Sequence, residues 1–234
     1  MDQTNSPDKL NQTYRLLALC ARAEGHPQMY EQLAVQLDRF TAWHELPARA
    51  EAHGMAPLLW HHVQKSGISI PAGTQRILKG LYLRHRSLSQ AHTRVLIEII
   101  SLLNQADIRP LLLKGLALAY QYYPDPALRP ATDIDLLVKQ DEVSCVRHLL
   151  AGVGYRMALP KAGLAYIPKE LSTDSPMKDG ISIHVEVHHY NPKGRIYDDH
   201  SRDQEFEGFE ETPYSLTIGG KTILTSAPIR AVQF

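Results

Sequence analysis

The sequence has little cysteine and lacks any long run of apolar residues. Only two of its 234 residues are cysteines, Cys20 and Cys145, and they form no C-x-x-C pair. This argues against a disulfide framework and predicts two reduced, buried thiols in a reducing compartment. No stretch approaches the roughly 18 uninterrupted apolar residues of a membrane-spanning helix, so we expect no membrane partner. The polar N-terminal residues MDQTNSPDKL lack the apolar core of a signal peptide, so we expect a cytoplasmic protein.

The sequence also lacks an excess of charge of either sign. Lys+Arg and Asp+Glu both number 25, so the formal net charge is zero. A chain without a global field does not steer a polyanion such as bulk DNA unless it carries a local basic patch. Hydrophobic residues make up 44% of the chain and charged residues 21%, which excludes the disordered and collagen-like classes. The composition therefore predicts an ordinary globular protein with a substantial core.

The chain has two parts of different texture. Residues 8–106 carry apolar side chains at helical spacing, with breaks at Gly25 and Gly54. The last helix of this part is predicted at 74–104, and Gly80 is the residue at which it would break. From Ile108 onward, short apolar runs alternate with turn residues. We therefore predict an α+β protein with a helical domain at 1–106 and a small α/β domain with a mixed sheet at 107–234.

The second part is predicted to contain four strand regions and two short helices. The glycine pair Gly219-Gly220 between two alternating runs is typical of a β-hairpin. The acidic, irregular stretch 198–211 is expected to be a solvated loop. The predicted elements are a strand at 108–113, a helix at 116–122, a strand at 133–138, a helix at 141–150, a strand at 181–188 and the hairpin at 214–224.

A D-x-D pattern stands at the start of one predicted strand. Side chains at positions i and i+2 of a strand point to the same face, so Asp133 and Asp135 would lie roughly 7 Å apart along it. Two like charges on one face repel, and a divalent cation would compensate them. Mg²⁺ is commonly held by one or two carboxylates together with substrate phosphates. The alternative is that both acids merely form the solvent-exposed face of an edge strand.

Basic residues and a glycine near this strand favour the metal interpretation. Lys114-Gly115 lies where a strand ends and a helix is predicted to begin, and a helix N-terminus attracts anions. Gly115 would let a phosphate approach the backbone. Lys114 and Arg129 could each add a positive charge for a phosphate group. Together with the two aspartates, these residues predict a phosphate cradle that faces a metal site.

The order of these motifs resembles the DNA polymerase beta-like nucleotidyltransferase superfamily and, within it, the bacterial family of uncharacterised nucleotidyltransferases. In that family, Lys-Gly after a strand is followed by a short helix, Tyr-Pro-Asp-Pro, Leu-Arg-Pro and Asp-Ile-Asp-Leu-Leu-Val. The upstream stretch WHELPARAEAHGMAPLL also resembles the helical lead-in of the family, and the resemblance covers most of residues 40–226. The matching segments here are Leu113-Lys114-Gly115, Tyr123-Pro124-Asp125-Pro126, Leu128-Arg129-Pro130 and residues 133–138.

The resemblance implies a polymerase-beta-like α/β domain and a function. The protein would transfer a nucleoside monophosphate from an NTP such as ATP to an acceptor hydroxyl, with one or two Mg²⁺ ions as cofactors. The family has a third acid before x-His, which matches Glu186 in Val-Glu-Val-His. Asp133, Asp135 and Glu186 would hold the metal, or Glu186 would take the proton of the acceptor. Lys114, Gly115 and Arg129 would bind the nucleotide. The acceptor, whether protein, RNA or small molecule, is not readable from the sequence, and neither is the oligomeric state.

The sequence departs from the superfamily at two places, which leaves a second function open. After the first strand the superfamily more often has Gly-Gly or Gly-Ser, whereas this chain has Gly115-Leu116. The sequence also stops soon after the final hairpin, where relatives commonly continue into further helices, so it would be either a short form without these helices or a truncated one. The alternative is therefore a non-catalytic nucleotide-binding or interaction protein on the same fold.

A third possibility comes from the histidines on the strand that carries the third acid. His184, Glu186 and His188 share one strand face, and imidazole with carboxylate can bind Zn²⁺. Three ligands on one extended strand span roughly 13 Å, so a zinc hydrolase would need further ligands from elsewhere. We instead expect His188 to be hydrogen-bonded beside the acidic site, where it would be an accessory residue.

Overall fold

The computed structural model describes residues 7–157, 170–177, 180–190 and 213–225. The chain forms two compact units, one made of 1–89 with 122–130 and the other of 90–121 with 131–234. These units are defined by contacts, and the domain boundary at residue 106 stays a prediction about how the chain folds. The predicted acidic loop at 198–211 lies outside the described residues. Within the described residues, none of the helices is long and apolar enough to cross a membrane.

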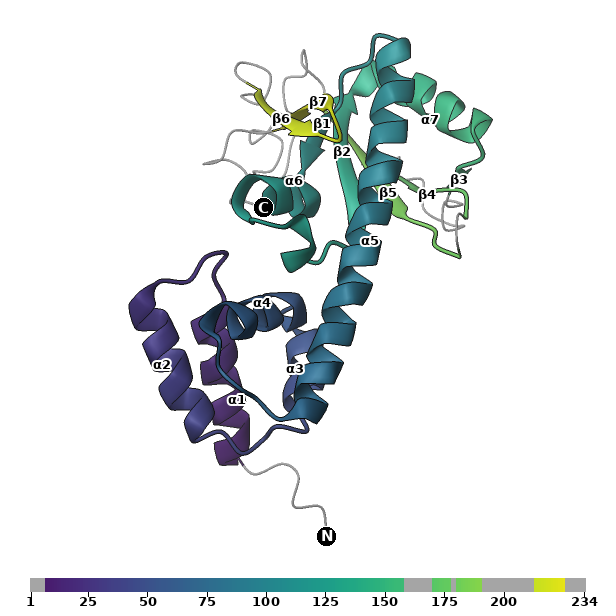
Figure 1. Cartoon of the computed structure of the whole chain (residues 1–234). Coiled ribbons are helices and arrows are strands. Elements are labelled where there is room, and N and C mark those ends of the chain that lie inside the picture. Colours follow the sequence, from purple (N-terminus) through teal and green to yellow (C-terminus); the bar gives the residue numbers. More distant parts are fainter. Residues whose placement is uncertain (1–6, 158–169, 178–179, 191–212, 226–234) are drawn as a thin grey trace, which may run out of the picture. The chain divides into compact units, whose positions relative to one another are not determined.

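The first unit is helical, as predicted. It contains α1 (Pro7–Cys20), α2 (Pro27–Asp38), α3 (Leu46–Ala52), α4 (Ala56–Ser66), the first part of α5 (Ala72–Gln105) and the short 3₁₀ helix η1 (Pro126–Leu128) (Figure 1). Prolines in the first turns fit helix starts, because their missing N–H has no partner there. Gly67 ends α4 with φ of 68°, a conformation that favours glycine. The core includes the buried side chains of Leu16, Leu33, Leu59 and Trp60.

Two expectations about the helical part are corrected by the structure. Helix α5 runs from Ala72 to Gln105 without a break at Gly80, which lies on its exposed side. A single exposed glycine costs a helix only about 1 kcal/mol, so the buried apolar face of α5 outweighs it. Cys20 is buried as predicted, but Cys145 is exposed. Cys145 lies on the solvent side of an amphipathic helix, a side that periodicity alone did not assign.

The second unit is built on a seven-stranded mixed sheet. The strands are β1 (Leu111–Leu113), β2 (Asp133–Lys139), β3 (Arg156–Met157), β4 (Glu170–Asp174), β5 (His184–Tyr190), β6 (Tyr214–Ile218) and β7 (Lys221–Thr225). Their order across the sheet is β3-β4-β5-β2-β1-β7-β6. The pairs β2–β5 and β1–β7 are parallel, and the other neighbours are antiparallel. The predicted α+β class with a mixed sheet and the predicted hairpin are confirmed.

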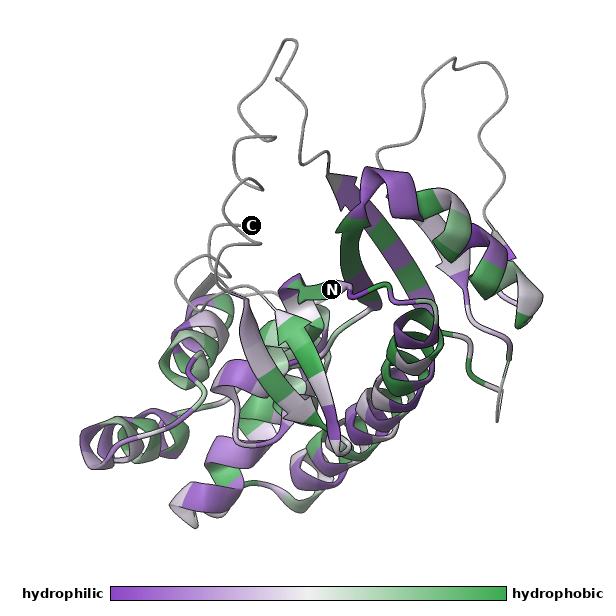
Figure 2. Cartoon of the chain, turned by 90° about the horizontal axis from the view of Figure 1, so that it is seen from above, coloured by the Kyte–Doolittle hydropathy of each residue, from purple (hydrophilic) through white to green (hydrophobic). Residues whose placement is uncertain are grey.

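One face of this sheet is covered by helices. The second part of α5 and α7 (Val143–Gly152) pack against it, together with residues of α6 (Lys114–Tyr122) (Figure 1). Ile134 and Leu136 of β2 and Val185 and Val187 of β5 point into this core, and all four are fully buried. The residues that alternate with them point to the opposite face: on β5 these are His184, Glu186 and His188, and on β2 they are Asp133, Asp135 and the apolar Leu137. Figure 2 shows alternating hydrophilic and hydrophobic bands along the strands. The acidic residues therefore lie on the face opposite α5.

Several element ends differ from the predicted ones for local reasons. Strand β1 begins at Leu111, not at residue 108, because Pro110 has no N–H to donate to a ladder. The preceding residues close the end of α5, since Asp107 has φ of 59° and the Ile108 N–H donates to the carbonyl of Leu103. Strand β5 begins at His184, because the Ile183 N–H donates to the Ser175 hydroxyl instead. Strands β3 and β4 were not predicted.

Candidate metal and nucleotide site

Two parallel neighbouring strands bring the acidic residues together. In the β2–β5 register, Asp133 pairs with His184, Asp135 with Glu186 and Leu137 with His188. Neighbouring strands lie about 4.8 Å apart, so side chains paired in register on one face are direct neighbours. Asp135 and Glu186 therefore stand side by side, although 44 residues of sequence separate their strands. The D-x-D strand is a central strand of the sheet and not an edge strand, which excludes the exposed-edge alternative.

Three side chains of these strands form a group that could hold a metal ion. One ligand atom from each of Asp135, Glu186 and His188 lies within 4.8 Å of the others. Asp133 is half-buried on the same face and lies two residues before Asp135, but it does not belong to this group among the described residues. The structure thus joins two of the three predicted metal ligands and adds His188. The role of each predicted residue in catalysis stays a prediction.

Asp135 is the buried centre of the group. Its side chain is only 3% exposed, and its Oδ1 atom lies 2.7 Å from Lys114 Nζ and 2.8 Å from His188 Nε2. A carboxylate only accepts hydrogen bonds, so Nε2 of His188 carries the hydrogen and donates it to Asp135. A protonated Nε2 cannot also accept a hydrogen bond, so the 3.3 Å distance between Lys114 Nζ and this Nε2 is a close contact. Burial alone would raise the pKa of Asp135. The hydrogen bonds from His188 and Lys114 outweigh burial and lower this pKa below its usual value.

Lys114 reaches Asp135 because of where β1 ends. Leu113, the last residue of β1, pairs with Asp135, and α6 begins at the next residue. Lys114 itself has φ of 47°, a left-handed conformation that is rare for a residue with a side chain. Such a conformation persists where the surroundings over-determine it, and here the contact with a buried carboxylate fixes the side chain. The sequence analysis predicted a phosphate-binding role for Lys114, which stays a prediction, and it did not predict the contact with Asp135.

Glu186 has histidines on both sides along its own strand. His184 Nε2 and His188 Nε2 each lie 3.6 Å from a carboxylate oxygen of Glu186. His184 also contacts Asp174 of β4, with 2.9 Å between Nδ1 and Oδ1. The hydrogen bond with Asp174 raises the pKa of His184, although partial burial opposes it. Asp174 was missed by the sequence analysis because β4 was not predicted, and only the pairing of β4 with β5 brings it to the site.

The group fits a divalent cation in its donor chemistry. Two carboxylates supply the oxygen ligands that Mg²⁺ and Mn²⁺ prefer, and an imidazole nitrogen is also accepted by Mn²⁺ and Zn²⁺. The ammonium group of Lys114 now supplies the positive charge beside Asp135. A cation bound to Asp135 Oδ1 would therefore compete with Lys114. His188 could serve as a ligand only through a nitrogen that has lost its hydrogen.

The other two predicted nucleotide-binding residues occupy different places. Gly115 is the second residue of α6 and is half-buried, next to the start of the helix at the site. Arg129 follows η1 and belongs to the first compact unit. Asp125 caps η1 through a 2.9 Å bond from the Ala127 N–H, which orders the Asp-Pro part of the Tyr-Pro-Asp-Pro motif. The roles of Gly115 and Arg129 in phosphate binding stay predictions.

Comparison with known protein families yields a match that covers most of the chain. The family described as "Uncharacterised nucleotidyltransferase" matches residues 41–233. Among curated proteins, none matches the chain.

Some solved structures show a distant likeness to this fold. The lincosamide antibiotic adenylyltransferase LnuA, with lincomycin bound, is 14% identical, with a TM-score of 0.41 and coverage of 59% of this chain and 82% of its own. ANT(2")-Ia in complex with adenylyl-2"-tobramycin is 10% identical, with a TM-score of 0.39 and coverage of 61% and 72%. An antigenic nucleotidyltransferase-like protein from Paracoccidioides brasiliensis is 14% identical, with a TM-score of 0.38 and coverage of 64% and 62%. Likenesses at this level say nothing about a substrate.

Proposed function

Since the chain belongs to the family of uncharacterised nucleotidyltransferases, we propose that it transfers a nucleoside monophosphate from an NTP to an acceptor hydroxyl in a metal-dependent reaction. One observation carries this proposal: Asp135 and Glu186 are paired in register on two central parallel strands, with His188 beside them. Phosphoryl-type transfer depends mainly on positioning and on charge neutralisation, which such a group of carboxylates can provide once it holds a cation.

In this proposal, Asp135 and Glu186 hold Mg²⁺ or Mn²⁺, with Asp133 as a further ligand and His188 as an accessory residue. The bound ion would neutralise charge on the triphosphate. His188 and Lys114 keep Asp135 ionised and fix its orientation, because both contact the same oxygen of this carboxylate. A metal ligand must be deprotonated, so a lowered pKa of Asp135 keeps it available at neutral pH.

Lys114 has a second part in the proposed reaction. Its side chain is 40% exposed, so its ammonium group can leave Asp135 without having to cross a packed core. When a cation takes its place on Oδ1, Lys114 would turn to a phosphate oxygen of the NTP. Gly115 next to it would give the phosphates access to the backbone, and Arg129 would add a further positive charge. We keep the cytoplasm as the proposed location.

The first test measures binding, because the acceptor is a protein, an RNA or a small molecule that remains to be found. Titration with Mn²⁺, followed by electron paramagnetic resonance, should show saturable binding to the wild-type protein. Asp135→Asn should weaken this binding at least about tenfold, since it removes a charged ligand from a buried group. Asp141→Asn is the matched control, because Asp141 is exposed and lies outside the group. Equal Mn²⁺ affinity in both variants would contradict the proposed metal site.

The second test measures transfer. The protein is incubated with each α-³²P-labelled NTP, Mg²⁺, and in turn a protein extract, an RNA pool and a small-molecule extract. Label should appear in one of these fractions with release of pyrophosphate. Asp135→Asn should reduce the rate at least about 100-fold, as the loss of a group that stabilises transition-state charge commonly does. Undiminished transfer by Asp135→Asn would refute the proposal.

Two other functions are distinguished by the same experiments. NTP binding in a calorimeter without pyrophosphate release on any acceptor would favour the non-catalytic nucleotide-binding protein. The zinc hydrolase gains one argument from the geometry, since Asp135 supplies a ligand from a second strand to Glu186 and His188. It predicts one equivalent of zinc in elemental analysis of the purified protein. Binding of Mn²⁺ or Mg²⁺ to a zinc-free preparation, with restored transfer, would exclude it.

A further inference from the structure

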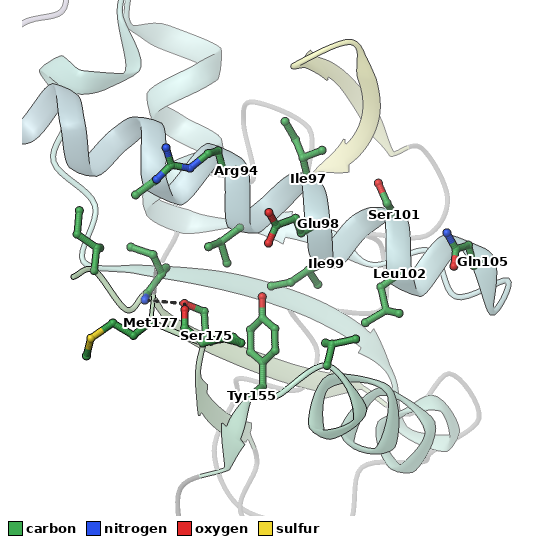
Figure 3. Close-up of a pocket in the computed structure, with 16 residues that line it drawn as sticks. Arg94, Ile97, Glu98, Ile99, Ser101, Leu102, Gln105, Tyr155, Ser175 and Met177 are labelled. Carbon is green, nitrogen blue, oxygen red and sulfur yellow. Dashed lines mark hydrogen bonds between the residues drawn. The ribbon is translucent and has the colours of Figure 1, made fainter. Parts of the chain in front are cut away.

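A cavity lies in the second unit, on the face of the sheet opposite the acidic group. It has a volume of about 620 Å³ and lies between the C-terminal part of α5, the residues after α7 and the turn before β5 (Figure 3). Ligand pockets for small molecules commonly measure about 300–1,000 Å³. The buried residues Ile99 and Ile183 belong to its wall and also to the main apolar core. The cavity is therefore of the size and kind that holds a small, largely apolar molecule.

The rim of the cavity is apolar and exposed. Val153 and Met177 are 48% and 72% exposed, and both line the cavity. Single exposed apolar side chains are ordinary, but exposed apolar side chains that adjoin an apolar cavity extend its apolar surface, and contiguous apolar surface is typical of ligand-binding grooves. Methionine also adapts its shape to irregular apolar ligands. These two side chains would come into contact with a molecule that enters the cavity.

Tyr155 gives the cavity a specific polar group. Its side chain is only 7% exposed, and its hydroxyl is buried and has no hydrogen-bond partner among the residues that the structure describes. Figure 3 shows the hydroxyl directed across the cavity toward α5. The Tyr155 backbone is held in place, because its N–H donates to the carbonyl of Leu150 at the end of α7. Buried hydroxyls are normally paired, so a fixed and unpaired one that points into a cavity indicates a missing partner atom.

The other polar groups of the wall narrow the chemistry of that partner. Ser175 is satisfied within the protein, since its hydroxyl accepts from the Ile183 N–H at 2.9 Å and lies 3.3 Å from the Pro176 carbonyl oxygen. Arg94 and Glu98 are exposed and carry opposite charges, so the cavity favours neither an anion nor a cation. Burial, with the nearby Glu98 carboxylate, raises the pKa of Tyr155 to about 12, so its hydroxyl stays neutral and can donate.

We propose that this cavity binds a neutral, largely apolar small molecule with an oxygen atom that accepts a hydrogen bond from the Tyr155 hydroxyl. Side chains on this face of β5 alternate with those of the acidic group, so the sheet separates the ligand from Asp135. The ligand is for that reason an additional ligand and not the acceptor of nucleotidyl transfer. This inference does not depend on the proposed transferase activity.

The test uses Nile red, a neutral fluorescent probe with a carbonyl oxygen, and the full-length protein. The wild-type protein should bind it in a saturable way with one site per chain. Leu102→Trp, which fills the cavity, should abolish this binding, and Leu83→Trp at an exposed position of the same helix is its matched control. Tyr155→Phe should weaken binding about fivefold, as the loss of one neutral hydrogen bond does. Tyr214→Phe, at an exposed tyrosine, should leave it unchanged.

A second readout separates a ligand-binding role of Tyr155 from a structural one. Without ligand, Tyr155→Phe should melt at the same temperature as the wild type or higher, because within the described part of the chain the hydroxyl has no partner to lose. A lower melting temperature would assign the hydroxyl to the fold and overturn the proposal. The proposal is also overturned if the binding of Nile red to the wild-type protein does not saturate, if Leu102→Trp binds Nile red as the wild type does, or if Tyr155→Phe keeps full affinity for it.

Discussion

Replacing Lys114 by methionine should destabilise the second unit in the absence of divalent cations. The variant keeps the apolar stem of the side chain but removes the ammonium group that lies 2.7 Å from Asp135 Oδ1. Asp135 is almost fully buried, so its carboxylate loses a charged partner that water cannot fully replace. The substitution removes one positive charge beside Asp135 and leaves the other side chains of the group unchanged.

The expected loss of stability depends on how exposed the side chains of Lys114 and Asp135 are. Removing one partner of a fully buried ion pair costs about 3–5 kcal/mol. Lys114 is 40% exposed and His188 still donates to the same oxygen, so the loss should be closer to that of one charged hydrogen bond, about 2 kcal/mol. For a chain of this length, that corresponds to a fall in melting temperature of about 4–8 °C.

A second variant at the same position separates the side chain from the backbone. Lys114→Gly removes the same charge, but glycine adopts φ of 47° without steric cost. Left-handed backbone costs other residues roughly 1 kcal/mol, so Lys114→Gly should be more stable than Lys114→Met by about that amount. Both variants should also bind Mn²⁺ more tightly than the wild type, because they have no ammonium group that competes for Asp135.

The assay is urea unfolding in a buffer with a chelator, with hydrogen exchange of peptides from β2 and β5 to locate the change. Both tryptophans, Trp43 and Trp60, lie in the first unit, so their fluorescence does not report on the site directly. Lys221→Met, at an exposed lysine of the second unit, is the matched control. If Lys114→Met unfolds at the same urea concentration as Lys221→Met, the reasoning about a buried carboxylate and its cation is refuted.

Three further predictions concern the rest of the chain. Burial lowers the pKa of His62, so the unfolded state binds a proton at this residue more readily than the folded state does. The first unit should therefore lose stability as the pH falls from 7.5 to 5, which tryptophan fluorescence in urea at both pH values should show. His62→Gln should reduce the difference in stability between the two pH values. A thiol reagent should label Cys145 within minutes and leave Cys20 unlabelled in the native protein. Cys145 is exposed, whereas burial raises the pKa of Cys20 to about 12. If mass spectrometry finds both cysteines labelled at the same rate, this prediction is contradicted. Gly219→Ala should destabilise more than Gly220→Ala, because both have positive φ but only an added Cβ at Gly219 would collide with a side chain of α5; equal melting temperatures would refute the role of that collision.

Elements with a clear periodic pattern of apolar residues, or with a characteristic turn pair, were predicted correctly from the sequence. The D-x-D strand, the strand of Glu186 and the Gly-Gly hairpin each have alternation or a turn pair that is visible in a short window. Their ends were less predictable, since partners outside the window decide them, as when Ser175 takes the N–H of Ile183. Strand β4 lacks a periodic pattern of its own, and its conformation comes from pairing with β5.

The candidate site was predictable in part for the same reason. Two acids on one strand face follow from spacing alone, whereas the neighbour of Asp135 across the sheet depends on the register of β2 and β5. The choice of Glu186 came from a family resemblance. Lys114 was found as a basic residue, but its contact with Asp135 depends on where β1 ends and on a left-handed backbone that no sequence pattern marks for lysine. The apolar cavity beside Tyr155 had no signal in the sequence.

The short pairing of β1 with β7 has a consequence for handling the protein. Only Leu111 and Leu112 pair with β7, and the Thr225 hydroxyl adds a bond of 2.7 Å to the Leu112 carbonyl. If the hairpin were cut away, the apolar segment Leu111–Leu113 would become an open edge with unpaired backbone groups, a template for aggregation. Truncated variants that end before residue 213 should therefore precipitate, even though Asp133, Asp135 and Glu186 would all still be present.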